Sequence, residues 1–198
     1  AATETEPYVG RSVPRKEDAT LLTGRGSYVD NLSVPGMLWM AVVRSPHAHA
    51  RLTKVDVSKA AAADGVVAAF SGADLANEWA GGLPCAWPVT EDMKSPEHFP
   101  LAVDEVHYQG DGVAVVIADT RAHAVDAAEL VDVDYAPLDV IVDVEAAARD
   151  GATLVHEDLG TNVSYVWKLE TGAFDESADV VVKHRYVQPP LIPNAIEP

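Results

Sequence analysis

The amino-acid sequence predicts an α+β fold, because strand-like and helix-like segments are mixed without the one-to-one alternation of a doubly wound α/β sheet. Residues 113–118 form an unbroken apolar run, which is typical of a strand covered on both faces. Residues 131–135 alternate between apolar residues and aspartates, which is typical of a strand with one dry and one wet face. The chain has 198 residues, 48% of them hydrophobic, so it can bury a sizeable core in one or two compact units.

A first strand–helix–strand unit is predicted to end at Phe70. Residues 52–57 alternate imperfectly between apolar and polar side chains, and Ser58 is a suitable N-cap for an alanine-rich helix over residues 59–63. Gly65 can adopt the left-handed conformation that commonly follows a helix. Residues 66–70 then return as an apolar strand.

A second unit is built around the apolar run at residues 113–118. The glycine turn at residues 110–112 leads into this strand, and Asp119 or Thr120 is expected to cap a helix over residues 121–130. The helix has one apolar stripe that should face the core. The stripe consists of Ala124, Val125, Ala128 and Val131.

The remaining elements are predicted from shorter patterns. Strands are expected at residues 37–43, 105–108, 163–167 and 180–188, and a helix at residues 143–149. The Gly24-Arg-Gly26 segment lacks the third glycine of a dinucleotide-binding motif, because Val29 occupies that position. We therefore expect a simple turn there.

The composition excludes several classes of protein. The chain carries 14 Lys and Arg residues against 31 Asp and Glu residues, a formal net charge of −17, which repels a phosphate backbone and argues against a nucleic-acid partner. Cys85 is the only cysteine, so no disulfide can form within the chain and no four-cysteine metal site can be built from it. No apolar run reaches the roughly 20 residues of a membrane span, and no secretory signal pattern occurs. We therefore expect a cytoplasmic protein without a membrane span.

The segment RSPHAHARL places two histidines and two arginines close together in an acidic chain. In a strand, His47 and His49 would share a face, as a pair of zinc ligands does, but no HExxH, CxxC or similar group supplies a further ligand. We therefore expect no metal site, and a metal-dependent enzyme centred on these histidines stays a minority hypothesis. Pro46 lacks an amide donor and marks an edge or bend. Arg44 and Arg51 are expected to pair within the domain or across an interface.

Glycines and prolines break the periodic pattern between Gly72 and Pro100. Such a long irregular segment is unusual inside a compact domain, and it carries Trp79 and Trp87. It either folds back on its own domain or forms a contact surface for another domain or subunit. Cys85 lies in the same segment without a local base, so packing is expected rather than nucleophilic chemistry. The residues give no self-contained catalytic site.

Five colinear stretches closely resemble the N-terminal part of the large, molybdenum-containing subunit of the xanthine dehydrogenase and aldehyde oxidase family. The segments GRGSYVDN, RSPHAHA and PNAIEP are most similar in sequence to the carbon monoxide dehydrogenase large-subunit branch. The resemblance covers nearly the whole chain. The five stretches are VGRSVPRKEDATLLTGRGSYVDNL, PGMLWMAVVRSPHAHARL, DGVVAAFSGADL, PLAVDEVHYQGDGVAVVIADTRAHAVDAAELVDVDYAPL and IPNAIEP.

The resemblance implies an α/β-hammerhead domain, an α+β unit with mixed sheets and short helices. It implies an N-terminal extended segment at residues 1–35, the hammerhead domain at residues 36–150, and a connecting segment and strand at residues 151–198 that lead toward a molybdenum-cofactor domain. No catalytic, cofactor-binding or metal-binding residue of the family can be transferred to this chain. The residues expected to have a structural or interface role are Arg44, His47, His49, Arg51, Trp79 and Trp87.

The resemblance also implies the chemistry and partners of the parent protein, an oxidoreductase. Molybdopterin cytosine dinucleotide would be bound by the rest of the large subunit, 2Fe-2S clusters by a small subunit and FAD by a medium subunit. The 198-residue chain alone is predicted to be an inactive scaffold. The alternative is a free-standing interaction module that docks on a partner subunit through residues 72–100.

Overall fold

The computed structural model describes residues 8–84, 87–170, 172, 177 and 179–188. Internal contacts divide the chain into two compact units, residues 1–36 with 178–198 and residues 37–177. We call the second of these the core unit. The predicted three-part division at residues 35 and 150 stays a prediction.

The described residues of the first unit contain two short helical elements. These are helix α1 (Asp18–Leu22) and the 3₁₀ helix η1 (Val29–Asn31). Between them, Gly24 has a φ of 67° and donates its amide to the Leu21 carbonyl. The predicted turn at Gly24 is therefore confirmed.

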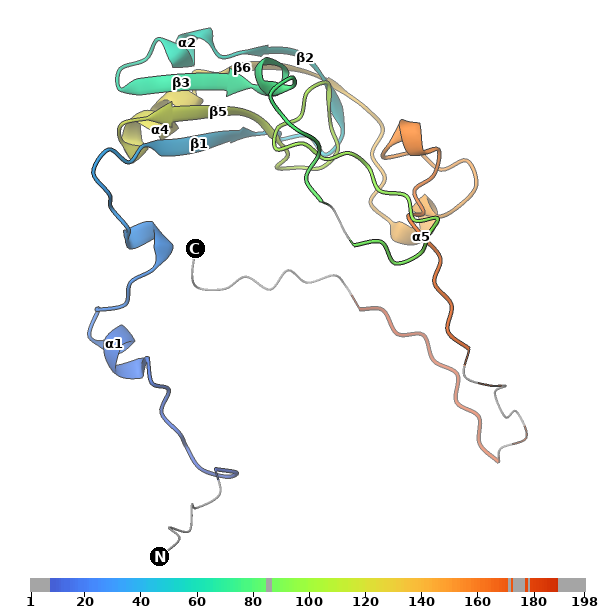
Figure 1. Ribbon diagram of the computed structural model, residues 1–198. Coiled ribbons are helices and arrows are strands. Elements are labelled where there is room, and N and C mark those ends of the chain that lie inside the picture. The colour runs from blue at the N-terminus through green and yellow to red at the C-terminus, as the bar shows by residue number, and fades with distance from the viewer. Residues whose placement is uncertain (1–7, 85–86, 171, 173–176, 178, 189–198) are drawn as a thin grey trace, which may run out of the picture. The chain divides into compact units, whose positions relative to one another are not determined.

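The first sheet of the core unit has β5 (Gly112–Ala118) at its centre. Strands β1 (Trp39–Arg44) and β3 (Val66–Ser71) pair with it from either side, both antiparallel, as Figure 1 shows. Val113 and Val116 are completely buried in β5. An apolar run without alternation fits this position, because side chains on both faces of a central strand are covered.

The second sheet has the order β4-β2-β6, again antiparallel. Its strands are β4 (Glu105–Val106), β2 (Ala50–Asp56) and β6 (Asp132–Pro137). In β6, Val133 and Tyr135 pack against the core while Asp132 and Asp134 are exposed. The predicted alternation of this strand is confirmed, although β4 is shorter than the predicted strand at residues 105–108.

Two clusters of buried apolar side chains form the core, and β5 contributes to both. Val113 packs with Ala50 and Val106 of the second sheet. Val116 packs with Ala60 of helix α2 (Ser58–Ala61) and with Ala127 of helix α4 (Arg121–Ala128). Burial of each valine contributes roughly 1.5–3 kcal/mol relative to an exposed side chain. The central strand therefore connects the packing of both sheets.

Helix α4 (Arg121–Ala128) begins where the sequence indicates. The Thr120 hydroxyl accepts the His123 amide at 3.2 Å, so Thr120 is the N-cap. The predicted apolar stripe is wrong at one position: Ala124 and Ala127 are buried, but Val125 is 48% exposed. Residues 124, 127 and 128 share one side of the helix, whereas residue 125 is displaced from residue 124 by about 100°.

Two predicted strands are wrong. The described residues 163–167 and 180–188 contain no strand, and Val166 and Val182 are largely exposed. An apolar run becomes a strand only where a neighbouring strand supplies the ladder of hydrogen bonds, and the described chain offers none at either place.

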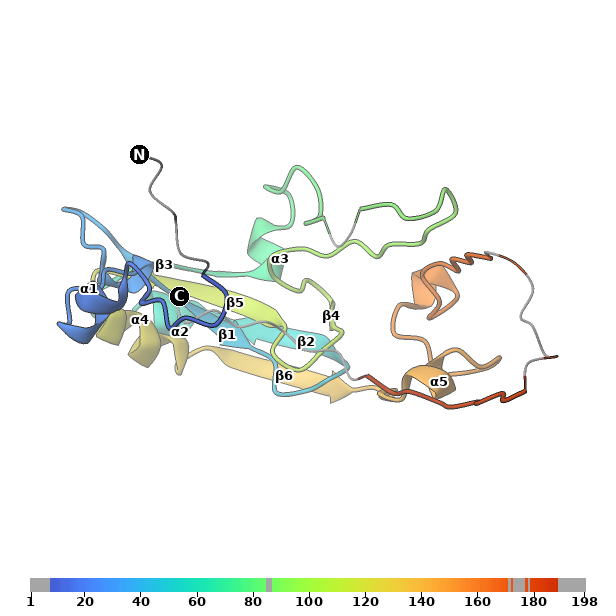
Figure 2. The same cartoon turned by 90° about the horizontal axis from the view of Figure 1, so that it is seen from below.

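The remaining elements are single turns. They are α3 (Gly72–Leu75), α5 (Val144–Ala147) and the 3₁₀ helix η2 (Glu157–Leu159). The first is capped by Ser71, whose hydroxyl accepts the Asp74 amide, and the second by Asp143. Helices α4 and α5 lie at opposite ends of the core unit (Figures 1 and 2). No helix in the described part of the chain is long and apolar enough to cross a membrane.

Candidate functional site

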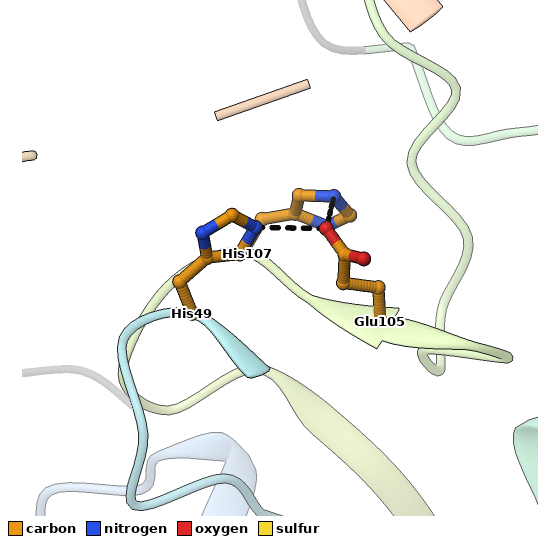
Figure 3. A group of neighbouring side chains, drawn as sticks. All are labelled: His49, Glu105 and His107. Atoms are coloured by element: carbon orange, nitrogen blue, oxygen red, sulfur yellow. Dashed lines mark hydrogen bonds and ion pairs between the residues drawn. The ribbon is translucent and has the colours of Figure 1, made fainter. Parts of the chain in front are cut away.

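A group of two histidines and one glutamate lies where β2 and β4 meet. In this antiparallel pair Ala50 is opposite Val106, and Arg51 is opposite Glu105. Because side chains alternate along a strand, the residues on either side of Val106 face the same way as the residues on either side of Ala50. The pairing therefore gathers His49, Glu105 and His107, as Figure 3 shows.

The Glu105 carboxylate lies between the two imidazoles. Its Oε1 atom is 2.8 Å from His49 Nε2 and 3.5 Å from His107 Nε2. Its Oε2 atom is 3.5 Å from the Arg51 Nε atom. Arg51 thus occupies one carboxylate oxygen, which leaves the other directed at the histidines (Figure 3).

Both ring nitrogens of His49 face oxygen atoms that only accept hydrogen bonds. His49 Nδ1 is 2.8 Å from the Asp139 carbonyl oxygen, so Nδ1 carries the proton of that bond. Nε2 then faces the Glu105 carboxylate. Two facing lone pairs at this distance would repel each other, so a proton or a bound cation must lie between the two atoms.

His107 and His156 are stacked, with ring centroids 4.2 Å apart and an angle of 22° between the rings. Burial lowers the pKa of His107, and the nearby His156 lowers it further. Burial likewise lowers the pKa of His156. Both imidazoles are therefore held toward the neutral form, which has a lone pair free to bind a proton or a metal ion.

Two cavities give access to this group. One of about 310 Å³ is lined by His49, His107 and Asp139 among others. The other, of about 220 Å³, is lined by Glu105 and again by His107. The group is thus reachable by small ions and water.

The other residues of the RSPHAHARL segment contact neighbouring parts of the same chain. The Arg44 Nη1 atom donates to the Gly110 carbonyl at 2.8 Å, and Ser45 makes backbone hydrogen bonds with Gly110 and Asp111. The His47 ring lies 4.9 Å from the Tyr135 ring. Residues 45–49 form bends, and β2 begins only at residue 50, so His47 does not join the group at His49. This segment ties the start of β2 to the turn before β5 and to β6.

The two tryptophans of the irregular segment differ in their surroundings. Trp79 stacks on Phe99, with ring centroids 5.2 Å apart, which closes the segment on itself. Trp87 is 91% exposed. Cys85 lies outside the described residues.

Glu105 and His107 were not predicted as site residues, because they are more than fifty positions from His49 in the sequence. The available signal was the pair of alternating patterns His-Ala-Arg at residues 49–51 and Glu-Val-His at residues 105–107. Their side chains meet only if these two short strands are known to pair in antiparallel register.

Comparison with known proteins identifies the family. Residues 23–139 match the family described as aldehyde oxidase and xanthine dehydrogenase, a/b hammerhead domain. The chain is 35% identical over 175 residues to the nicotine 6-hydroxylase large subunit of Paenarthrobacter nicotinovorans, covering 87% of this chain and 21% of that protein. It is 40% identical over 161 residues to the carbon monoxide dehydrogenase large chain of Afipia carboxidovorans, covering 80% of this chain and 19% of that protein.

The fold agrees with these sequence relatives. The crystal structure of quinoline 2-oxidoreductase from Pseudomonas putida 86 superposes with a TM-score of 0.70 at 41% identity, covering 79% of this chain and 20% of that chain. Other relatives include a xanthine dehydrogenase molybdenum-binding subunit of Escherichia coli O157:H7. The chain spans about a fifth of the length of the relatives it matches. It belongs to the aldehyde oxidase and xanthine dehydrogenase family of molybdenum-containing oxidoreductases and contains that family's α/β-hammerhead domain.

Proposed function

We propose that this chain is the N-terminal scaffold part of a large subunit of the carbon monoxide dehydrogenase type, and that it supplies no reacting group to the oxidation. The observation that carries this proposal is the match of residues 23–139 to the hammerhead domain, within relatives of whose length the chain covers about a fifth. A domain that recurs in enzymes named for different substrates is suited to holding the subunit together rather than to selecting the substrate.

The contacts of the RSPHAHARL segment support a bracing role. Arg44 binds the Gly110 carbonyl, His49 binds the Asp139 carbonyl and Arg51 pairs with Glu105. Each polar side chain reaches an element distant in the sequence. We propose that these residues fix the junction of the two sheets.

The described residues do not fit a pterin dinucleotide. Four cavities lined by them have volumes of about 150 to 310 Å³, at or below the roughly 300–1,000 Å³ of sites for drug-sized ligands. The cavity beside Glu105 is also lined by the carboxylates of Asp104 and Asp111, which would repel a diphosphate. We therefore derive no step of the reaction from this chain and assign molybdopterin cytosine dinucleotide to the rest of the subunit.

The proposed partners follow from the same family membership. The rest of the large subunit would bind the molybdenum cofactor, and a small subunit with 2Fe-2S clusters and a medium subunit with FAD would carry electrons away. We propose a cytoplasmic complex, consistent with a single cysteine and the absence of a candidate span among the described helices.

The alternative of a free-standing interaction module is less well supported. This alternative depends on the two tryptophans in residues 72–100. Trp79, however, stacks on Phe99 within the same segment. Trp87 remains exposed and available to a partner. This exposure fits equally a contact with the rest of a large subunit.

The experiment that tests the proposal is immunopurification from the native cell with an antibody against this chain. We expect a polypeptide several times the 21.0 kDa of this sequence, with molybdenum, iron and flavin in the same complex. A native polypeptide near 21.0 kDa without these groups would overturn the proposal. Stoichiometric molybdenum in the purified 198-residue chain would also contradict the scaffold role.

A further inference from the structure

We propose that His49, Glu105 and His107 form a binding site for Zn²⁺ that joins the start of β2 to the end of β4. The three side chains offer two imidazole nitrogens and one carboxylate oxygen, all within 4.8 Å of one another. Two histidines and one glutamate are a ligand set that zinc uses with a water molecule in the fourth position.

Two of the three distances between ligand atoms suit a tetrahedral ion after a small movement, and the third, between the two imidazole nitrogens, is within 4.8 Å. Ligand atoms about 2.0–2.1 Å from a tetrahedral zinc ion are about 3.3 Å from one another. His107 Nε2 and Glu105 Oε1 are already 3.5 Å apart. His49 Nε2 and Glu105 Oε1 are 2.8 Å apart and would separate by about half an ångström. Rotation of the glutamate side chain, which extends from a strand end, can provide this movement.

The surrounding hydrogen bonds prepare the ligands. Donation from His49 Nδ1 to the Asp139 carbonyl fixes the tautomer that leaves Nε2 free, which is the usual arrangement behind a metal-bound histidine. Arg51 holds the other oxygen of Glu105. A cation between Nε2 and the carboxylate oxygen, which are 2.8 Å apart, would bind the lone pairs of both atoms.

The electrostatic environment favours a cation. One carboxylate among the ligands leaves the complex with a formal charge of +1, and Asp104 and Asp111 line the adjoining cavity. The whole chain has a net charge of −17. The two cavities that reach His107 give room for the water that would complete the coordination.

A bound ion would have a structural consequence. Strand β4 contains only two residues, so few ladder hydrogen bonds fix its register against β2. Ligands on both strands would lock this pairing. We therefore assign the site a stabilising role at the junction of the second sheet with the first.

Zinc titration of the metal-free 198-residue chain by calorimetry tests the site. We expect one ion per chain, and binding at least tenfold weaker in H107Q and in E105Q, each of which removes one ligand while keeping side-chain size. The control H123Q removes an exposed imidazole outside the group and should bind zinc like the wild type. Substitution of His49 is avoided, because His49 is nearly buried and also holds Asp139.

Thermal unfolding with and without zinc gives a second readout. Zinc should raise the melting temperature of the wild type and of H123Q, and leave H107Q unchanged, because an ion that binds only the folded chain stabilises it. Circular dichroism of each variant without metal establishes that it is folded. The absence of zinc binding, equal binding in H107Q and E105Q, or loss of binding in H123Q would overturn the proposal.

Discussion

At the scale of single residues, the exposed pair Asp119 and His123 has a defined pH dependence. His123 Nδ1 donates to Asp119 Oδ1 at 2.6 Å, and this hydrogen bond raises the pKa of His123 above its ordinary 6.5. The same bond lowers the pKa of Asp119 below 3.8. The histidine contribution is fully present below pH 6.5 and is lost as the pH rises through the raised pKa. The aspartate contribution is present above pH 3.8 and is lost as the pH falls through the lowered pKa.

The pair is therefore expected to stabilise the fold most between about pH 4 and pH 6.5. Urea unfolding of the wild type and of H123Q should differ most near pH 5, and the difference should shrink by about pH 9. The effect should be small and weaken with salt, because both side chains are exposed. A difference of equal size at the two pH values would contradict this account.

Gly65 is a second residue whose substitution should change the stability of the fold, because an added Cβ atom would meet a close neighbour. It has a φ of +76°, and a Cβ atom there would lie 2.0 Å from His123 Nδ1. We expect G65A to lower the free energy of unfolding by about 1–3 kcal/mol, from backbone strain and from displacement of the Asp119–His123 pair.

Gly160 provides the matched control for this substitution. It has a φ of +67° but no neighbour within 4 Å of an added Cβ atom. G160A should therefore cost only the backbone term, about 1 kcal/mol. Equal losses in the two variants, measured by urea unfolding, would show that the contact at His123 has no effect.

At the scale of elements, the structure places one valine in the core and another at the surface. Val116 of β5 is completely buried between Ala60 and Ala127, whereas Val125 of α4 is 48% exposed. V116A should lower the free energy of unfolding by about 2 kcal/mol, because it removes buried methyl groups and leaves a cavity. V125A should change it by less than about 0.5 kcal/mol. Chemical unfolding measures the free energy of unfolding of both variants. Comparable losses in the two would show that Val125 also belongs to the core.

The elements also show what the sequence could and could not predict. Continuous apolar residues were sufficient for β5, and alternation was sufficient for β6, because those patterns depend on burial alone. The strands expected at residues 163–167 and 180–188 failed because a strand also requires a partner. The group at His49 was missed for the same reason, since only the pairing of β2 with β4 brings Glu105 and His107 to it.

At the scale of the whole molecule, the exposed apolar side chains of the core unit predict self-association. Val166, Trp167 and Leu169 are each more than 60% exposed and follow closely in the sequence. Exposed apolar side chains gathered in one segment favour contact with another protein surface. We expect the isolated chain to sediment with an average mass that rises with concentration, and L169D to weaken this association.

A charge-matched control separates apolar contact from charge repulsion. S12D introduces the same negative charge at an exposed position outside the core unit. It should leave the association of the chain unchanged. A monomer at all concentrations in the wild type would contradict the prediction of self-association.

The position of β5 at the centre of the first sheet has a consequence for synthesis on the ribosome. Strand β1 ends at residue 44, but the strand it pairs with is complete only at residue 118. At about 5–20 residues per second, a growing chain waits roughly 4–15 s between these points. During this time the edges of β1 and β3 have no partner and are open to pairing with other nascent chains. Chaperones are therefore expected to bind the growing chain during translation, before β5 emerges and completes the sheet.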